Sequence, residues 1–190
     1  MQWPDFDWAF RHATKLLKEA ERKFFDRDKR YTFAGVRFGK LQDLGPGERP
    51  PPGISFSENN FVYIEIRPDA NWPDQALFQV AHEVIHLLAP TKGDASMLEE
   101  GLAVDFSLRV KFPDPNYRDL ARTHLAAKEP KYQAAHALYR ELIDIDPNAI
   151  RKLRKCQPEF SKISEDLICK VIPAVRVDLA RQLTECKPMR

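Results

Sequence analysis

The amino-acid sequence predicts an α+β fold, with one helix first, a small sheet next and helices over the remainder of the chain. Apolar residues recur at helical spacing over the first 28 residues, and strand-like patterns occupy short stretches between residues 31 and 67. From about residue 74 onward the spacing is helical again. Because strands and helices fall in separate runs instead of alternating, a parallel α/β sheet is not expected.

The first predicted helix runs to about residue 28, with Asp5 or Asp7 as its N-cap. Its buried stripe consists of apolar residues at helical spacing, namely Ala9, Ala13, Leu16, Leu17, Ala20 and Phe24.

Three strands follow, at residues 31–39, 54–57 and 61–67, and we expect a small, twisted, mostly antiparallel sheet. Residues 58–60 turn between the last two strands, and Val62, Ile64 and Ile66 share one face. Residues 44–53 contain three consecutive prolines, which cannot join a ladder, so this segment is a loop, either a mobile flap or a plain connector.

The helical remainder begins with two helices joined by a short loop. The first starts near Asp74, its expected N-cap, and ends before Pro90; the second covers residues 96–110. Further helices are expected at residues 116–128 and 130–143, with a third starting near residue 146 and one or two more beyond it. We expect one domain over residues 1–190, with a helix-and-sheet part at 1–90 and a helical part at 91–190.

The balance of charge disfavours some classes of partner. Thirty Lys and Arg residues against 28 Asp and Glu residues leave a net charge of +2, which disfavours nucleic acid or an anionic membrane as the main partner. The basic cluster of Arg151, Lys152, Arg154 and Lys155 is typical of a solvated helix face.

Three cysteines without a C-x-x-C pair predict free thiols. The N-terminal residues do not resemble a signal peptide, and no apolar run approaches the ~18 residues of a membrane span. The expectation is a cytoplasmic protein with no membrane partner, while export without such a signal and the oligomeric state stay open.

The stretch "VAHEVIH" carries the chemistry. His82 and His86 lie one helical turn apart, so their Cβ atoms are about 5–6 Å apart and both rings can bind one Zn²⁺ ion. Glu83 lies beside that position and can accept a proton there. The H-E-x-x-H pattern is a metallopeptidase signature. The alternative is two ordinary histidines on a solvated face, with Glu83 paired to a nearby base.

A catalytic zinc site needs a third protein ligand. Glu99 and Glu100 stand at the start of the next helix, and Gly101 lacks a side chain that would keep that helix away from the first. The alternative for this acidic pair is compensation of the helix dipole.

"HEVIH" followed by "EEGLA" resembles the gluzincin zinc metallopeptidases, in particular the small peptidase-MA-like or minigluzincin family. The resemblance covers residues 54–106 and implies a zincin-like fold. It implies Zn²⁺ held by His82, His86 and Glu100, with Glu99 as the fallback third ligand. It also implies hydrolysis of a peptide or protein substrate by a water that the metal activates, with Glu83 as general base.

Several further roles follow from the resemblance. A tyrosine or histidine from the helical part stabilises the oxyanion in similar enzymes, and Tyr132 is our choice over Tyr139 and His136, all three of which can also be packing residues. Asp105 or Glu99 can orient a ligating imidazole.

If the strand at 61–67 borders the cleft, it can bind substrate. Its free edge can pair with an extended peptide. The resemblance makes Glu58 an anchor for a substrate amine, although its pattern fits a hairpin turn better.

Two alternatives to an active peptidase stay open. The chain can be an inactive zincin-like binding or scaffold module, or a zymogen whose C-terminal helices, from about Cys156, cover the cleft.

Overall fold

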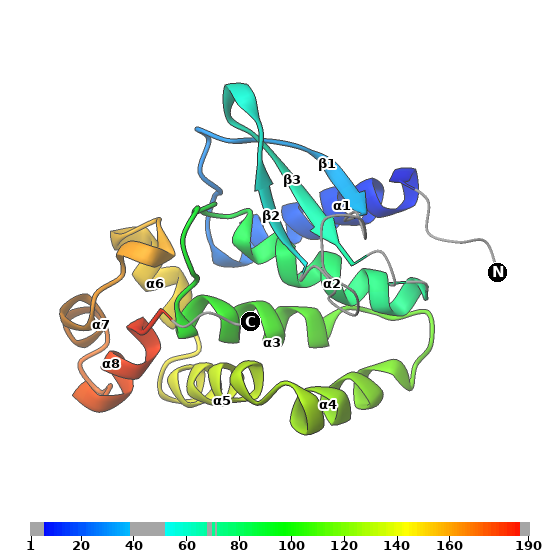
Figure 1. Ribbon diagram of the computed structural model, residues 1–190. Coiled ribbons are helices and arrows are strands. Elements are labelled where there is room, and N and C mark those ends of the chain that lie inside the picture. The colour runs from blue at the N-terminus through cyan, green and yellow to red at the C-terminus, as the bar shows by residue number, and fades with distance from the viewer. Residues whose placement is uncertain (1–5, 39–51, 68–69, 71, 187–190) are drawn as a thin grey trace.

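The computed structural model describes residues 6–38, 52–67, 70 and 72–186, and the described chain is α+β, as predicted. Helix α1 (Phe6–Phe24) precedes a three-stranded sheet, and seven further α-helices follow it (Figure 1). Asp7 lies inside the first turn of α1 and is not its cap, whereas Asp5 lies outside the described residues. The helix ends four residues earlier than predicted, and Phe25 then has a φ of 96°.

The sheet is mixed rather than mostly antiparallel. Its strands are β1 (Thr32–Phe38), β2 (Gly53–Phe56) and β3 (Phe61–Ile66), in the order β1-β3-β2. β2 and β3 form the predicted antiparallel hairpin around Glu58–Asn60, but β1 runs parallel to β3. Strand patterns carry no information on the direction of a neighbour that is not joined by a hairpin, which explains the error.

The position of β3 overturns one prediction about substrate binding. β3 pairs with β1 on one side and with β2 on the other, so it has no free edge for a peptide. Its Val62, Ile64 and Ile66 side chains are buried, as expected from their alternation. Within the described residues, β2 pairs only with β3, and its outer edge is unpaired.

The motif helix α2 (Pro73–His86) and the glutamate helix α3 (Met97–Arg109) pack against each other. Ser96 caps α3 by accepting a hydrogen bond from the backbone N–H of Glu99. Asp74 is not the cap of α2, because Pro73 already occupies the first helical position. Instead, Asp74 Oδ1 accepts a hydrogen bond from the backbone N–H of Asp114 at 3.1 Å.

Gly101 permits a close helix contact, but with a different helix from the one predicted. A Cβ atom at this position would lie 2.2 Å from the carbonyl oxygen of Ala135 and 2.6 Å from Cβ of Tyr139. Both residues belong to α5 (Pro130–Ile145), whereas the prediction named the motif helix. α3 is therefore held between α2 and α5.

The remaining helices are α4 (Tyr117–Lys128), α6 (Ala149–Cys156), α7 (Glu165–Val171) and α8 (Val177–Thr184). The segment after α8 returns to the start of α3, where the Met97 N–H donates to the carbonyl oxygen of Glu185 at 2.9 Å. One hydrophobic cluster runs from Ala9 in α1 to Leu183 in α8. The three cysteines are free thiols, as predicted.

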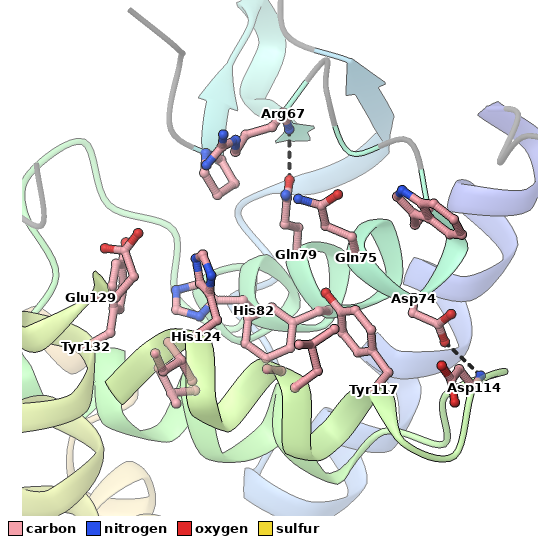
Figure 2. Close-up of a pocket in the computed structure, with 17 residues that line it drawn as sticks. Arg67, Asp74, Gln75, Gln79, His82, Asp114, Tyr117, His124, Glu129 and Tyr132 are labelled. Carbon is pink, nitrogen blue, oxygen red and sulfur yellow. Dashed lines mark hydrogen bonds between the residues drawn. The ribbon is translucent and has the colours of Figure 1, made fainter. Parts of the chain in front are cut away.

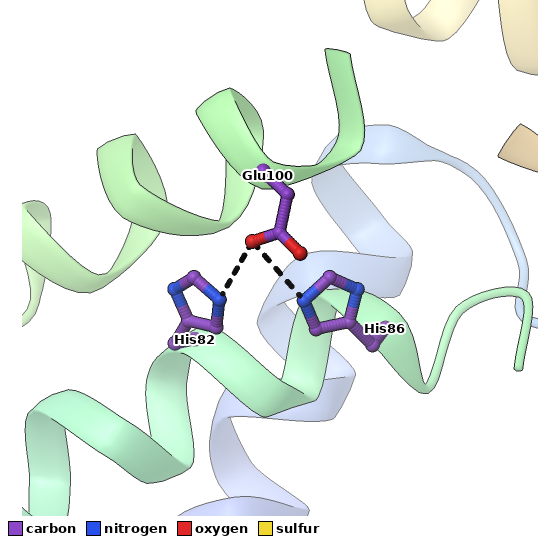
Figure 3. Close-up of side chains that lie close together, drawn as sticks. All are labelled: His82, His86 and Glu100. Carbon is purple, nitrogen blue, oxygen red and sulfur yellow. Dashed lines mark hydrogen bonds and ion pairs between the residues drawn. The ribbon is translucent and has the colours of Figure 1, made fainter. Parts of the chain in front are cut away.

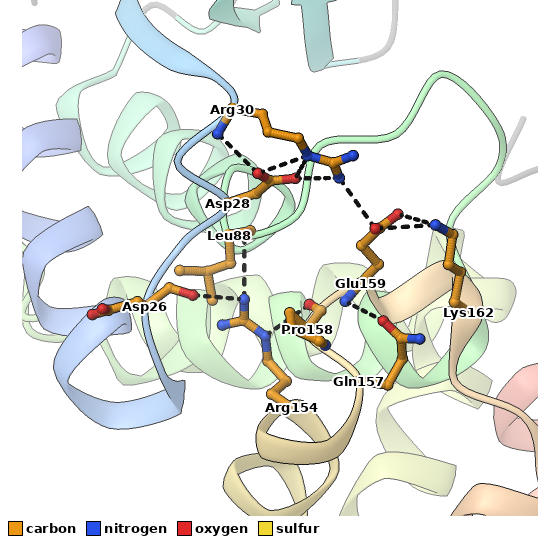
Figure 4. Close-up of polar contacts among 9 residues, drawn as sticks. All are labelled: Asp26, Asp28, Arg30, Leu88, Arg154, Gln157, Pro158, Glu159 and Lys162. Carbon is orange, nitrogen blue, oxygen red and sulfur yellow. Dashed lines mark hydrogen bonds and ion pairs between the residues drawn. The ribbon is translucent and has the colours of Figure 1, made fainter.

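Arg154 contradicts the prediction of a fully solvated basic face. Its side chain is 0% exposed and donates hydrogen bonds to five backbone carbonyls around the ends of α1 and α2 and the loop after α6. Figure 4 shows the contacts with Asp26, Leu88 and Pro158. The acceptors are Phe24, Phe25, Asp26, Leu88 and Pro158.

Of the helices in the described part of the chain, none combines the length and apolarity that crossing a bilayer requires.

Candidate metal centre

Three predicted ligands converge between α2 and α3. Nε2 of His82 lies 3.1 Å from Oε2 of Glu100, and Nε2 of His86 lies 3.8 Å from the same oxygen (Figure 3). One ligand atom from each of the three residues lies within 4.8 Å of the other two. The three side chains could therefore hold a single metal ion.

Two of the three separations are close to those of a tetrahedral site. Two ligand atoms, each about 2.0–2.1 Å from a zinc ion and at a tetrahedral angle, are roughly 3.3 Å apart. The distances of 3.1 and 3.8 Å from Glu100 to the two imidazoles lie on either side of that value. The ligand atoms of the two histidines lie within 4.8 Å of each other, so side-chain movement could close the three residues on one ion.

Glu99 contacts the other side of His86. Its Oε1 accepts a hydrogen bond from Nδ1 of His86 at 2.8 Å, and its side chain is almost completely buried. This contact fixes the ring so that Nε2 faces Glu100 and His82. Glu99 is therefore in the geometry of the imidazole-orienting acid and not in that of the fallback ligand.

Asp105 does not fill the orienting role that was also considered for it. Its Oδ1 lies 3.3 Å from Nε2 of His136, and its Oδ2 lies 2.7 Å from Nε of Arg109. Asp105 is on the α3 face that meets α5, away from the two ligating histidines. Asp105 follows Glu100 by five residues, which is about 140° more than one full helical turn, so it lies on another face of α3.

Electrostatics at this centre favour positive charge. Burial by itself would lower the pKa of His86, but the carboxylates of Glu100 and Glu99 raise it to about 10. Burial would raise the pKa of Glu100, and His86 and His82 hold it below its ordinary value. Three acids, Glu83, Glu99 and Glu100, are buried here beside two imidazoles, so the field of the protein attracts a cation.

Glu83 has the properties of a proton acceptor. Its side chain is buried. Burial raises the pKa of Glu83, while His86 and His82 partly oppose that rise. A desolvated carboxylate is more basic than one in water.

Of the three candidates for the oxyanion donor, only Tyr132 contacts a ligating residue. Its ring meets that of His82 edge to face, with centroids 5.5 Å apart. Burial, followed by Glu100 and Glu83, raises the pKa of Tyr132 well above its ordinary value. Tyr139 packs against Gly101 and His136 binds Asp105, so both stand in the α3–α5 contact.

A cavity of about 550 Å³ opens beside the centre, with His82 and Tyr132 in its wall (Figure 2). α4 supplies one side through Tyr117, Leu120, Ala121, His124 and Leu125. Sequence reasoning missed these residues, although their spacing of three and four positions marks one helix face. Glu58 does not line this cavity.

The C-terminal helices do not line the cavity either. Its described lining contains no residue beyond Tyr132, and α8 packs instead against α3 and α5. Among the described residues, the C-terminal helices therefore contribute nothing to the wall of this cavity, and the zymogen alternative stays a prediction.

Comparison with known proteins adds no relative. The chain matches no protein-family model, no curated protein and no solved structure. The gluzincin resemblance consequently depends on the two short motifs and on the geometry of their side chains.

Proposed function

We propose that the chain is a metal-dependent peptide hydrolase of zincin-like fold, with zinc as its ion. The observation that carries this proposal is the convergence of His82, His86 and Glu100 beside a buried acid, Glu83. Three protein ligands, with the fourth position left for water or substrate, are the usual arrangement in catalytic zinc sites. A purely structural site would have no use for the additional acid.

The choice of zinc follows from the donor set and the charge. Two imidazoles and one carboxylate suit zinc better than calcium or magnesium, which prefer oxygen ligands. The ion would offset the repulsion among the buried acids and, when bound, would supply the Lewis acid that activates water and polarises the scissile carbonyl.

Three side chains would transfer the proton, orient an imidazole and stabilise the oxyanion. Glu83 takes the proton of the attacking water and passes it to the leaving amine. Glu99 keeps the His86 ring in one orientation through the hydrogen bond to Nδ1. Tyr132 is protonated at neutral pH, as an ordinary tyrosine is, and burial raises its pKa further, so it can donate a hydrogen bond to the developing oxyanion.

A peptide fits the surroundings of the centre. The cavity beside His82 can receive a side chain, and the outer edge of β2, which no described strand pairs with, offers backbone groups to an extended chain. β2 thereby takes the role that the sequence had led us to expect of β3.

The Glu83→Gln variant tests this function against an inactive scaffold. The zinc-loaded wild type should hydrolyse a mixed peptide library, and the variant should lose activity by roughly three orders of magnitude or more because proton transfer is lost. Both proteins should hold one zinc per chain, as measured by elemental analysis. Equal peptide profiles for the two proteins, read by mass spectrometry, would reject the hydrolase.

A further inference from the structure

The cavity beside the metal centre has two chemically different ends. His82 and Tyr132 mark one end, and Asp74 and Asp114 lie together at the other (Figure 2). Between them the walls are largely apolar, with Phe78, Val104 and Leu120 among the lining residues. The cavity is thus an apolar passage from the reacting centre to a pair of carboxylates.

Asp74 is a nearly buried carboxylate in the wall of this cavity. The residue is only 9% exposed, and its Oδ1 accepts a hydrogen bond from the backbone N–H of Asp114 at 3.1 Å. Among the described residues, no second donor to Asp74 is seen. Trp72, 65% exposed, also lines the cavity. A cavity that combines a partly buried carboxylate with an indole ring is a favourable environment for a cation.

The balance of charge around the cavity is negative. Asp74, Asp114 and Glu129 contribute three carboxylates, against one guanidinium from Arg67. Arg67 lies away from the Asp74 end, and its backbone N–H donates to Gln79 Oε1 at 2.8 Å (Figure 2). A purely apolar occupant would take water away from the second carboxylate oxygen of Asp74. It would offer no hydrogen bond in place of those that water made, which is unfavourable.

The length of the passage suits a long side chain. Asp74 and His82 are eight positions apart on α2, which corresponds to roughly 12 Å along the helix axis. A substrate Cα next to the scissile carbonyl lies roughly 4–5 Å from the metal, given a bond of ~2 Å to the carbonyl oxygen. A lysine side chain adds roughly 6 Å, so its ammonium group would lie roughly 10–11 Å from the metal, which is close to the axial separation of His82 and Asp74.

We propose that the enzyme selects substrates with a lysine or arginine side chain next to the cleaved bond. The apolar walls cover the aliphatic stem, and Asp74 and Asp114 bind the charged group. This inference rests on the proposed function for the position of the scissile bond. The selectivity itself is a property of the cavity.

Four peptides that differ only at the residue next to the cleaved bond test the proposal. They carry lysine, arginine, norleucine or glutamate, and norleucine keeps the lysine stem without its charge. We expect kcat/KM for the two basic peptides to exceed that for norleucine roughly tenfold, the glutamate peptide being poorest. Affinities for the Glu83→Gln protein, measured by calorimetry, should follow the same order without turnover.

Two variants test whether Asp74 is the source of the preference for basic side chains. Asp74→Asn keeps the acceptor for the Asp114 N–H but removes the charge, so it should abolish the difference between lysine and norleucine peptides. Asp119→Asn, on α4 but outside the cavity lining, should preserve it. A lysine preference that survives Asp74→Asn, or a norleucine peptide that is bound and cleaved equally well by the wild type, overturns the proposal.

The two proposals fail in different ways. Hydrolysis without a basic preference leaves the metal-dependent function standing and rejects the selectivity. Selective binding of basic peptides without any hydrolysis supports the inference about the cavity and rejects the peptidase.

Discussion

Glu99 and Glu100 are adjacent in the chain but contact different groups. Glu100 approaches Nε2 of both histidines, whereas Glu99 accepts a hydrogen bond from Nδ1 of His86. Successive residues on a helix point about 100° apart, so the two acids reach opposite sides of the same imidazole. In the proposed metal site, the pair would therefore provide one ligand and one orienting group.

This division predicts unequal effects on metal affinity. Glu100→Gln removes a charged ligand and should weaken zinc binding by more than 100-fold, whereas Glu99→Gln should weaken it about 10- to 100-fold. Competition with a chromophoric chelator measures both constants. A larger loss from Glu99→Gln than from Glu100→Gln would show that the two roles are reversed.

The sequence could predict that His82 and His86 share one helix face with Glu83 beside them, because the H-E-x-x-H spacing places these side chains through helix geometry alone. It could not decide between Tyr132, Tyr139 and His136, since that choice depends on how α5 packs against α3. Asp74 was missed as a cavity residue because Pro73 takes over the start of α2, which leaves Asp74 free to bind Asp114.

Helices α3 and α5 pack closely at Gly101, which has no side chain to separate them. Gly101→Ala should lower the free energy of unfolding by about 3 kcal/mol or more, because the new methyl group meets backbone atoms that cannot move aside. Urea titration measures this loss. Gly53→Ala is the matched control, since a Cβ there has no neighbour within 4 Å. Equal stabilities of the two variants would contradict the packing described here.

Asp105 links the same two helices through charge, and this link predicts a dependence on pH. Burial would raise the pKa of Asp105, but hydrogen bonds from His136 and Arg109 hold it below 3.8. A lowered pKa stabilises the fold above pH 3.8, and that contribution is lost as pH falls through the folded-state value.

The wild type should therefore lose more stability than Asp105→Asn in this acidic window, as measured by thermal unfolding between pH 5 and 2. Asp119→Asn, at a highly exposed position, should follow the wild type. Parallel curves for wild type and Asp105→Asn would argue against the ion pairs at the α3–α5 contact.

Over the whole molecule, Arg154 joins the C-terminal helices to the ends of α1 and α2. Burial lowers the pKa of Arg154 to about 10, and the nearby carboxylates of Glu99 and Asp26 partly oppose this. The side chain remains charged at neutral pH and satisfies carbonyl groups that helix ends leave without partners. Its position, four residues after the buried Ile150, was a sign of burial that the run of basic residues obscured.

Arg154→Met should destabilise the whole chain by roughly 3–5 kcal/mol, because five carbonyl oxygens lose their donor. Arg151→Met, at an exposed position on the same helix, should change stability little. Chemical denaturation followed by circular dichroism separates the two. If both variants unfold at the same denaturant concentration, Arg154 does not hold these segments together.

Anomalous diffraction at the zinc edge, from a crystal of the zinc-loaded protein, tests the central claim most directly. We predict one peak between α2 and α3, about 2.0–2.2 Å from Nε2 of His82, Nε2 of His86 and a carboxylate oxygen of Glu100. Glu99 should remain hydrogen-bonded to Nδ1 of His86. No peak at that position, or a peak that lacks either imidazole, would contradict the account.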